Sequence, residues 1–183
     1  MITHRFRMAV PKDRQVRHHG RLLSLSVMLL LTPIAGTGSG AFANDLPLRS
    51  EGQIAQHAKA AWEQGTLNLA LGIVEQGIQD HPRALALHQL RGDMLATSRQ
   101  TEAALESYET VLASIPAALD VRWAKWSVLV RSGQVEEAVA ELQRIAVIDP
   151  HNPLLHLRLA RELRKLDRLE DSFEAYQKAL ELG

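Results

Sequence analysis

The absence of cysteine is the first constraint that this sequence of 183 residues places on function. A chain without thiols cannot form a disulfide scaffold, a thiolate zinc site, an iron–sulfur cluster, a cysteine nucleophile or a cysteine-linked lipid anchor. The sequence also has no H-E-x-x-H motif and no G-x-x-x-x-G-K-[ST] loop, the patterns of a zinc protease and of a phosphate-binding loop. We therefore predict a protein that is not an enzyme and that uses no metal and no cofactor.

Net charge is also absent, because 21 Lys and Arg balance 21 Asp and Glu. This zero is the sum of two unlike segments. Residues 1–43 carry six basic side chains and one acid, so the rest of the chain, 44–183, carries 15 basic and 20 acidic ones, a net charge of −5. An acidic body gives nucleic acid or an anionic membrane little electrostatic attraction, and we predict no nucleic-acid partner.

The segment 1–43 has the pattern of a cleaved secretory signal peptide. A basic start is followed by an apolar run from Leu22 to Ala35, which is shorter than the ~20 residues of a membrane-spanning helix. Small residues then lead to Ala41-Phe42-Ala43, an A-x-A cleavage site. We predict cleavage after Ala43, a short linker over 44–50, and export to the periplasm of a Gram-negative host with no stable membrane anchor. An uncleaved N-terminal anchor is the alternative.

The rest of the chain repeats itself at a fixed interval. Prolines recur at equal spacing at Pro82, Pro116 and Pro150. Small residues recur at the same spacing at Ala70, Ala104, Ala138 and Ser172. Several columns that share one period indicate a repeat architecture in which each unit packs against its neighbours.

Each copy contains two apolar patterns of helical period, separated by a turn. Gly65 and Gly133 mark the turn in two copies, since glycine adopts the left-handed conformation that ends a helix without strain. The prolines stop the second helix of each copy. The class is therefore all-α, with helices predicted over 51–64, 68–80, 84–97, 101–114, 118–131, 135–148, 153–166 and 169–182.

These columns resemble the tetratricopeptide repeat (TPR) family, and the final copy, with Tyr176-Gln-Lys-Ala-Leu-Glu-Leu182, matches the closing helix of its repeat best. The resemblance implies a right-handed superhelix, an α-solenoid, of about four repeats over 51–84, 85–118, 119–152 and 153–183. It also implies a protein–protein interaction scaffold or adaptor, which binds segments of partner proteins in a concave groove. With the predicted signal peptide, we expect this scaffold in the cell envelope. His88, Arg122 and His156 stand where the family often has tryptophan, although a slip of one residue would put Trp123 there instead.

The positions that face the groove in the family are carried by the first helix of each repeat. The resemblance implies that the groove of this chain is lined by Lys59, Trp62, Gln89, Asp93, Thr97, Trp123, Ser127, Arg131, Arg161, Arg164 and Lys165. The groove is then mixed at its start and basic at its end. The carboxylate clamp of chaperone adaptors is not matched, because Ala55, Leu90, Asp120 and Ala124 occupy four of its places.

Two groups of these residues allow two interpretations each. Arg161, Arg164 and Lys165, with Arg168, form either a solvated helix face near a helix C-terminus or a site for an acidic partner segment. Trp123 and Trp126 are either packing residues or a binding platform, and packing is favoured because large aromatic rings dominate core energetics. Stacking on Trp62 and Trp123 supports an alternative function, the binding of glycan or peptidoglycan fragments.

The last predicted helix presents an apolar face with Leu169, Phe173, Tyr176 and Leu180. A further repeat would cover such a face in a longer array. We predict that it pairs with a partner or forms a homo-oligomer through the C-terminal helix. A monomeric mass in light scattering over micromolar concentrations would count against self-association.

Overall fold

The structure is a computed structural model that describes residues 50–183, and these residues form eight α-helices and no β-strand. The helices are α1 (Glu51–Glu63), α2 (Leu67–Asp80), α3 (Leu85–Thr97), α4 (Thr101–Ser114), α5 (Leu119–Ser132), α6 (Val135–Ile148), α7 (Pro153–Lys165) and α8 (Leu169–Leu182). All eight predicted helices are confirmed, with ends that differ from the prediction by at most one residue. The predicted signal peptide lies outside the described residues.

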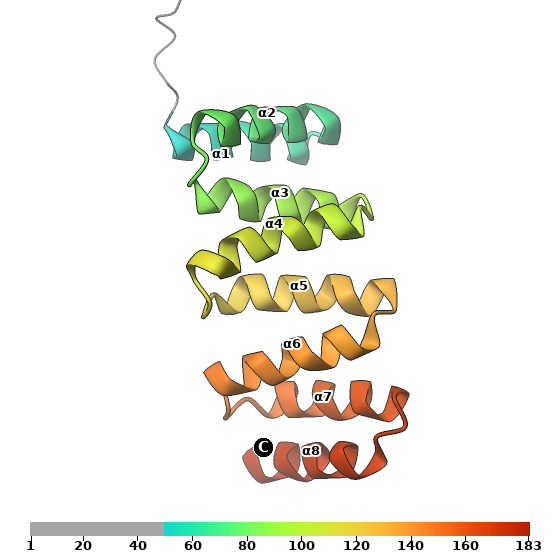
Figure 1. Cartoon of the computed structure of the whole chain (residues 1–183). Coiled ribbons are helices and arrows are strands. Elements are labelled where there is room, and N and C mark those ends of the chain that lie inside the picture. Colours follow the sequence, from blue (N-terminus) through green and yellow to red (C-terminus); the bar gives the residue numbers. More distant parts are fainter. Residues whose placement is uncertain (1–49) are drawn as a thin grey trace, which may run out of the picture. The chain divides into compact units, whose positions relative to one another are not determined.

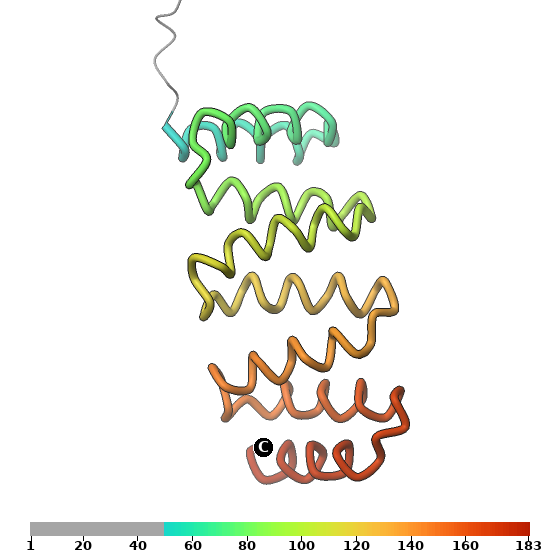
Figure 2. Tube along the Cα trace, in the orientation of Figure 1, coloured from blue at the N-terminus to red at the C-terminus, as the bar shows by residue number. Residues whose placement is uncertain are grey.

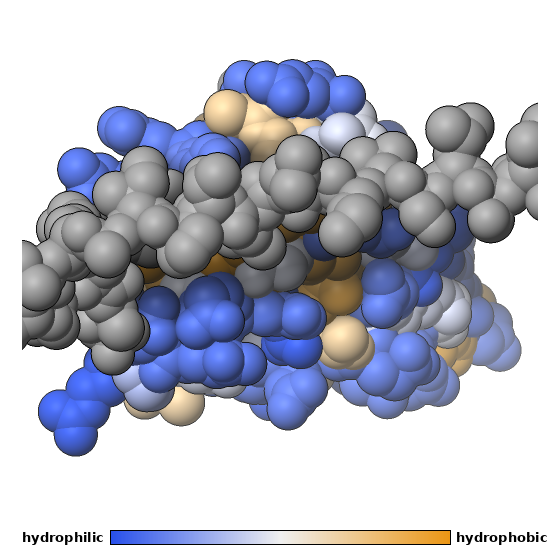
Figure 3. Space-filling model, turned by 90° about the horizontal axis from the view of Figure 1, so that it is seen from above, coloured by the Kyte–Doolittle hydropathy of each residue, from blue (hydrophilic) through white to orange (hydrophobic). Residues whose placement is uncertain are grey.

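The helices form four hairpins that follow one another along a stack (Figures 1 and 2). We call α1, α3, α5 and α7 the A helices and α2, α4, α6 and α8 the B helices. Each A helix packs most extensively on the B helix that follows it, and each B helix then packs on the next A helix. The A helices α1, α3 and α5 also contact one another directly, α1 with α3 and α3 with α5. The view onto the α1–α2 end shows mainly hydrophilic residues where the surface is visible (Figure 3).

One left-handed residue ends the A helix of every hairpin. Gly65 and Gly133 have φ angles of 79° and 76°, which confirms the predicted role of both glycines. The equivalent position of the other two repeats is held by Arg99 and Asp167, with φ angles of 62° and 57°. The left-handed conformation is costly for a residue with a side chain, and aspartate tolerates it better than most. Arg99 is therefore the exception among the four turns.

The turn between repeats is held by a second periodic contact. In three successive repeats the carbonyl oxygen of the proline accepts a hydrogen bond from the side chain six residues later. The pairs are His88 Nε2 and Pro82 at 3.1 Å, Arg122 Nε and Pro116 at 2.7 Å, and His156 Nε2 and Pro150 at 2.9 Å. These side chains stand where the family often has tryptophan. The shared contact shows that Arg122, and not Trp123, is equivalent to His88 and His156, so the repeats align without a shift of one residue.

Small residues let the two helices of each hairpin approach closely. Ala70, Ala104 and Ala138 are completely buried at the same position of α2, α4 and α6. In α8 the position is held by Ser172, whose buried hydroxyl donates a hydrogen bond of 2.8 Å to the carbonyl oxygen of Ala160. The serine therefore keeps the close approach without leaving a buried polar group unpaired.

Candidate functional site

All eleven residues predicted for the groove lie on A helices. We refer to the surface that these eleven residues form as the A-helix face. None is fully buried. The exposed ones are Lys59, Thr97, Arg131, Arg161, Arg164 and Lys165, and the half-buried ones are Trp62, Gln89, Asp93, Trp123 and Ser127. Their role in binding stays a prediction, but their side chains have the accessibility that binding requires.

Residues from three A helices come together around the middle of α3. Gln89 donates a hydrogen bond of 2.9 Å to Asp120 on α5, and buried Tyr108 on α4 donates one of 2.8 Å to Asp93. Burial raises the pKa of Asp93, and the charge of Asp120 adds to the rise, while the Tyr108 hydrogen bond and the charge of Lys59 on α1 oppose it. The structure thus brings together three of the predicted groove residues and fixes two carboxylates on the A-helix face.

The two tryptophans of α5 pack against each other. The rings of Trp123 and Trp126 are 5.5 Å apart at an angle of 89°, an edge-to-face contact. The guanidinium of Arg158 on α7 lies over both rings, 5.0 Å from that of Trp123 and 4.7 Å from that of Trp126. These contacts favour the packing interpretation, because a stacking platform needs an open ring face. Trp62 also packs against a cluster of buried residues from the first two repeats.

The basic cluster at the end of α7 consists of Arg161, Arg164, Lys165 and Arg168. Ion pairs within the described residues neutralise only part of it. Lys165 forms an ion pair of 2.7 Å with Glu162, and Arg168 pairs with Asp171 on α8. Arg161 and Arg164 are exposed and form no ion pair in the described part of the chain. The pairs agree with a solvated face for two of the four cations, and a site for an acidic partner segment at Arg161 and Arg164 stays a prediction.

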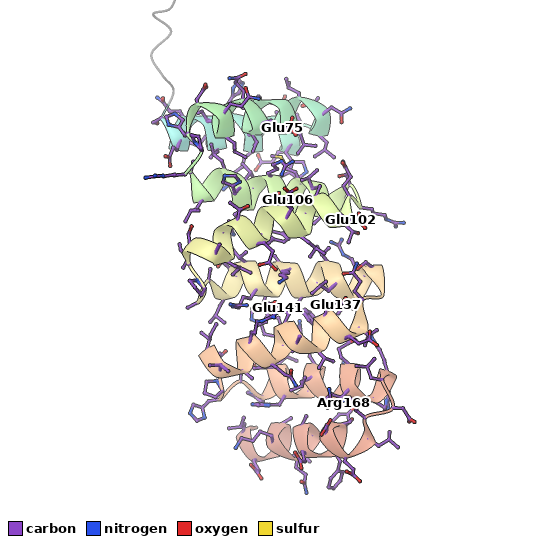
Figure 4. The ribbon with its side chains drawn as sticks, viewed as in Figure 1. Glu75, Glu102, Glu106, Glu137, Glu141 and Arg168 are labelled. Atoms are coloured by element: carbon purple, nitrogen blue, oxygen red, sulfur yellow. The ribbon has the colours of Figure 1, made fainter. Side chains whose placement is uncertain are left out.

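Charge is divided between the two sets of helices. The four A helices contain nine Lys and Arg against five Asp and Glu, whereas the four B helices contain two against twelve. Figure 4 labels Glu75 on α2, Glu102 and Glu106 on α4, and Glu137 on α6, among the acidic residues of the B helices. The sequence prediction found only the basic end of the groove. A count of charges for each predicted helix could have revealed the whole division.

A buried ionic network that the sequence did not reveal joins three helices. Glu141 on α6 is completely buried, and both its carboxylate oxygens are paired. Arg122 approaches one oxygen to 2.5 Å, and Lys125 and Arg144 lie 3.0 Å from the other. Burial alone would raise the pKa of Glu141, but the hydrogen bonds and charges of Lys125 and Arg122 outweigh it and lower the pKa. Lys125 also pairs with Glu109 on α4.

Residues 50–183 contain no group of three or more His, Cys, Asp or Glu side chains that could hold a metal ion. In the same range, no helix combines the length and the apolar character needed to cross a bilayer.

The apolar face predicted for the last helix is exposed. Leu169, Phe173 and Leu180 are 59%, 63% and 82% exposed, while Tyr176 is half-buried. Beside them an apolar cavity of about 490 Å³ is lined by Pro153, Leu154, Leu157, Tyr176, Ala179 and Leu180. The exposure is therefore confirmed for three of the four residues, and self-association through this face stays a prediction.

Comparison with known proteins agrees with the repeat and the helix pairing. The sequence profile of the tetratricopeptide repeat matches residues 56–119 and 124–183, most of the chain. The chain belongs to the tetratricopeptide repeat family. A search of curated protein sequences finds no match.

Solved structures of MamA proteins have the same fold. A MamA structure from Desulfovibrio magneticus RS-1 is 20% identical, with a TM-score of 0.62, and the match covers 72% of this chain and 75% of that one. A structure of MamA AMB-1 is 18% identical, with a TM-score of 0.65 over 75% of each chain. A third MamA structure is 14% identical, with a TM-score of 0.65 over 73% of this chain and 78% of that one. At these identities the likeness establishes the fold alone.

Proposed function

We propose that this chain is an exported, non-catalytic scaffold of the cell envelope that binds a segment of a partner protein on its A-helix face. The division of charge is the observation that carries the proposal. Five of the nine Lys and Arg side chains of the A helices are exposed, where a partner can reach them, and the B helices present an acidic surface. Charge complementarity of this kind orients a partner and selects one face of a protein over the other.

Fixed polar groups on the A-helix face support the same proposal. The Gln89–Asp120 and Tyr108–Asp93 hydrogen bonds join neighbouring helices, so their polar atoms are positioned before a partner arrives. Preorganised groups lower the entropy cost of binding. A stacked repeat array offers such groups along an extended surface, which suits an extended or helical segment.

Export rests on the sequence alone. A basic start, a short apolar run and Ala41-Phe42-Ala43 form a secretory signal, and we propose cleavage after Ala43 and a periplasmic location.

Site-specific photocrosslinking in cells of the native host tests both parts. The full chain is expressed with a photoreactive phenylalanine at exposed Thr97 on the A-helix face, or at exposed Glu106 on α4 as the matched control. We expect discrete adducts with a partner from Thr97 and none from Glu106. Adducts of equal strength from both positions, or from Glu106 alone, would contradict binding on the A-helix face.

The mass of the uncrosslinked chain in the same samples tests export separately. A chain that begins at Asn44 and is released by osmotic shock is expected. A full-length mass in the membrane fraction would support the uncleaved anchor, and a full-length mass in the cytoplasm would overturn export.

A further inference from the structure

A cleft at the edge of the A-helix face combines an apolar floor with cationic walls. It has a volume of about 450 Å³ and lies where the end of α3 and the start of α4 meet α5. Ala96 and Val128 are buried and contribute apolar atoms, whereas Arg99, Thr101 and Arg131 contribute polar ones. Of these lining residues, only Arg131 belongs to the predicted groove.

Neither arginine of the cleft has an anionic partner in the part of the chain that the structure describes. Glu102 follows Arg99 closely in the sequence, yet the two side chains form no ion pair. Arg122, by contrast, is fully paired with buried Glu141 on the same stack. Two guanidinium groups beside one cleft without a carboxylate create a concentrated positive potential.

The backbone of Arg99 adds an independent observation. Its φ of 62° is left-handed, a conformation that Gly65 and Gly133 adopt at the same position of other repeats without cost. The structure shows no contact that stabilises the long cationic side chain of Arg99 at this position. Residues held in such costly conformations cluster at binding sites, where the side chain is needed for another purpose than folding.

We infer that the cleft between Arg99 and Arg131 receives the side-chain carboxylate of a Glu or Asp in the bound partner segment. The inference rests on the proposed function and specifies the chemistry of the partner. A guanidinium pairs with a carboxylate through two parallel hydrogen bonds, and the methylene groups of the acidic side chain lie over Ala96 and Val128. The cationic excess of the A helices attracts an acidic segment to this face.

The acids of the A-helix face restrict where such a segment can place its charge. Asp93 and Asp120 lie close enough for the charge of Asp120 to raise the pKa of Asp93. A partner carboxylate beside them would meet repulsion, whereas Arg99 and Arg131 offer attraction. The carboxylate therefore lies at the cleft, and this part of the segment is acidic.

Titration of the full chain with three blocked peptides, followed through the Arg Nε–H signals in 1H–15N NMR spectra, tests the inference. Ac-Ala-Glu-Ala-NH2 is expected to shift the signals of Arg99 and Arg131 in a saturable way, while the signal of exposed Arg83 stays unchanged. Ac-Ala-Gln-Ala-NH2 is expected to shift none of them. A response of the cleft only to Ac-Ala-Ala-Ala-OH would assign it to a C-terminal carboxylate and overturn the side-chain assignment. Equal shifts of Arg83, Arg99 and Arg131, or no shift of any of them, would also overturn it.

Variants separate binding from folding. Arg99→Gly places in this turn the residue that two other repeats use, so we expect a melting temperature at or above that of the wild type. The same variant, and Arg131→Gln, should weaken binding of the Glu peptide at least tenfold, whereas Arg83→Gln changes it less than twofold. Arg99→Gly binding as tightly as the wild type would overturn the inference. If photocrosslinking from Thr97 still gives a partner adduct while the Glu peptide does not bind to the cleft, this inference is wrong and the proposed function still holds.

Discussion

Glu141→Gln is expected to lower the free energy of unfolding by about 3–5 kcal/mol at pH 7, because it removes the anion that buried Arg122 and Lys125 share. Lys125 keeps its pair with Glu109, whereas Arg122 is left without an anionic partner. Arg122 and Lys125 are each about 9% exposed, and their charges meet at the carboxylate of Glu141. The glutamine side chain keeps the size of glutamate but has no charge, and its amide group adds two donors where only acceptors fit. Burying a cation without a partner is among the most destabilising single changes.

Urea unfolding followed by circular dichroism measures this loss. Glu137→Gln is the matched control, since Glu137 is exposed one turn earlier on the same helix and should change stability by no more than ~0.5 kcal/mol. A change of less than ~1 kcal/mol for Glu141→Gln would show that the network contributes little to folding.

The pH dependence of stability gives a second signature of Glu141. Its pKa is lowered in the folded chain, so its charge stabilises the fold at pH values above the unfolded pKa of ~4.3. This contribution is lost as the pH falls through the lower, folded pKa. The stabilities of wild type and Glu141→Gln should therefore differ most above the unfolded pKa and converge only as the pH falls through the lower pKa that Glu141 has in the folded chain.

Gly92→Ala is expected to destabilise the fold by about 2 kcal/mol, although alanine normally favours a helix over glycine by about 1 kcal/mol. A Cβ atom at position 92 would lie 2.6 Å from Cε1 and 2.8 Å from Cδ1 of the Tyr108 ring. Tyr108 is 1% exposed and donates a hydrogen bond to Asp93. The ring therefore cannot move without disturbing its buried packing and this hydrogen bond. Overpacking of a buried site costs about 1–3 kcal/mol.

Gly72→Ala is the control that isolates this clash. Gly72 lies inside α2, and a Cβ atom there would meet no atom within 4 Å. The same substitution should therefore stabilise the chain by about 0.5–1 kcal/mol. Thermal unfolding of both variants gives opposite signs if the account is correct. A stabilised Gly92→Ala variant would mean that the Tyr108 ring yields freely.

The sequence predicted the helices well because its strongest signals are local and repeated. Proline removes a backbone donor, and glycine adopts the left-handed turn, so each marks a helix end whatever the surroundings. The columns of Pro82 and Ala70 then carried the register through every repeat. The left-handed turn at Arg99 was not predicted because arginine rarely marks such a turn, although Arg99 stands midway between Gly65 and Gly133 in the sequence.

The contacts between distant residues were much less predictable. Nothing in the local pattern distinguishes Glu141 from exposed Glu137, because both lie on an amphipathic helix and only the packing of α5 buries one of them. Arg158 likewise has a helical position but no sequence signal that it covers Trp123 and Trp126. Long-range pairs of this kind depend on side chains that extend from one helix to another. The local pattern of a single sequence does not indicate which of these side chains are in contact.

The central claim is that a partner binds to the cationic A-helix face. The most direct test measures the dissociation constant of the partner segment that Thr97 captures, by fluorescence anisotropy, for two variants with equal change of net charge. Arg161→Glu with Arg164→Glu alters the A-helix face, and Arg83→Glu with Lys178→Glu alters the α2–α3 loop and α8. We predict that the first pair raises the dissociation constant at least tenfold and the second pair less than twofold. Equal losses in both, or no loss in the first, would contradict the claim.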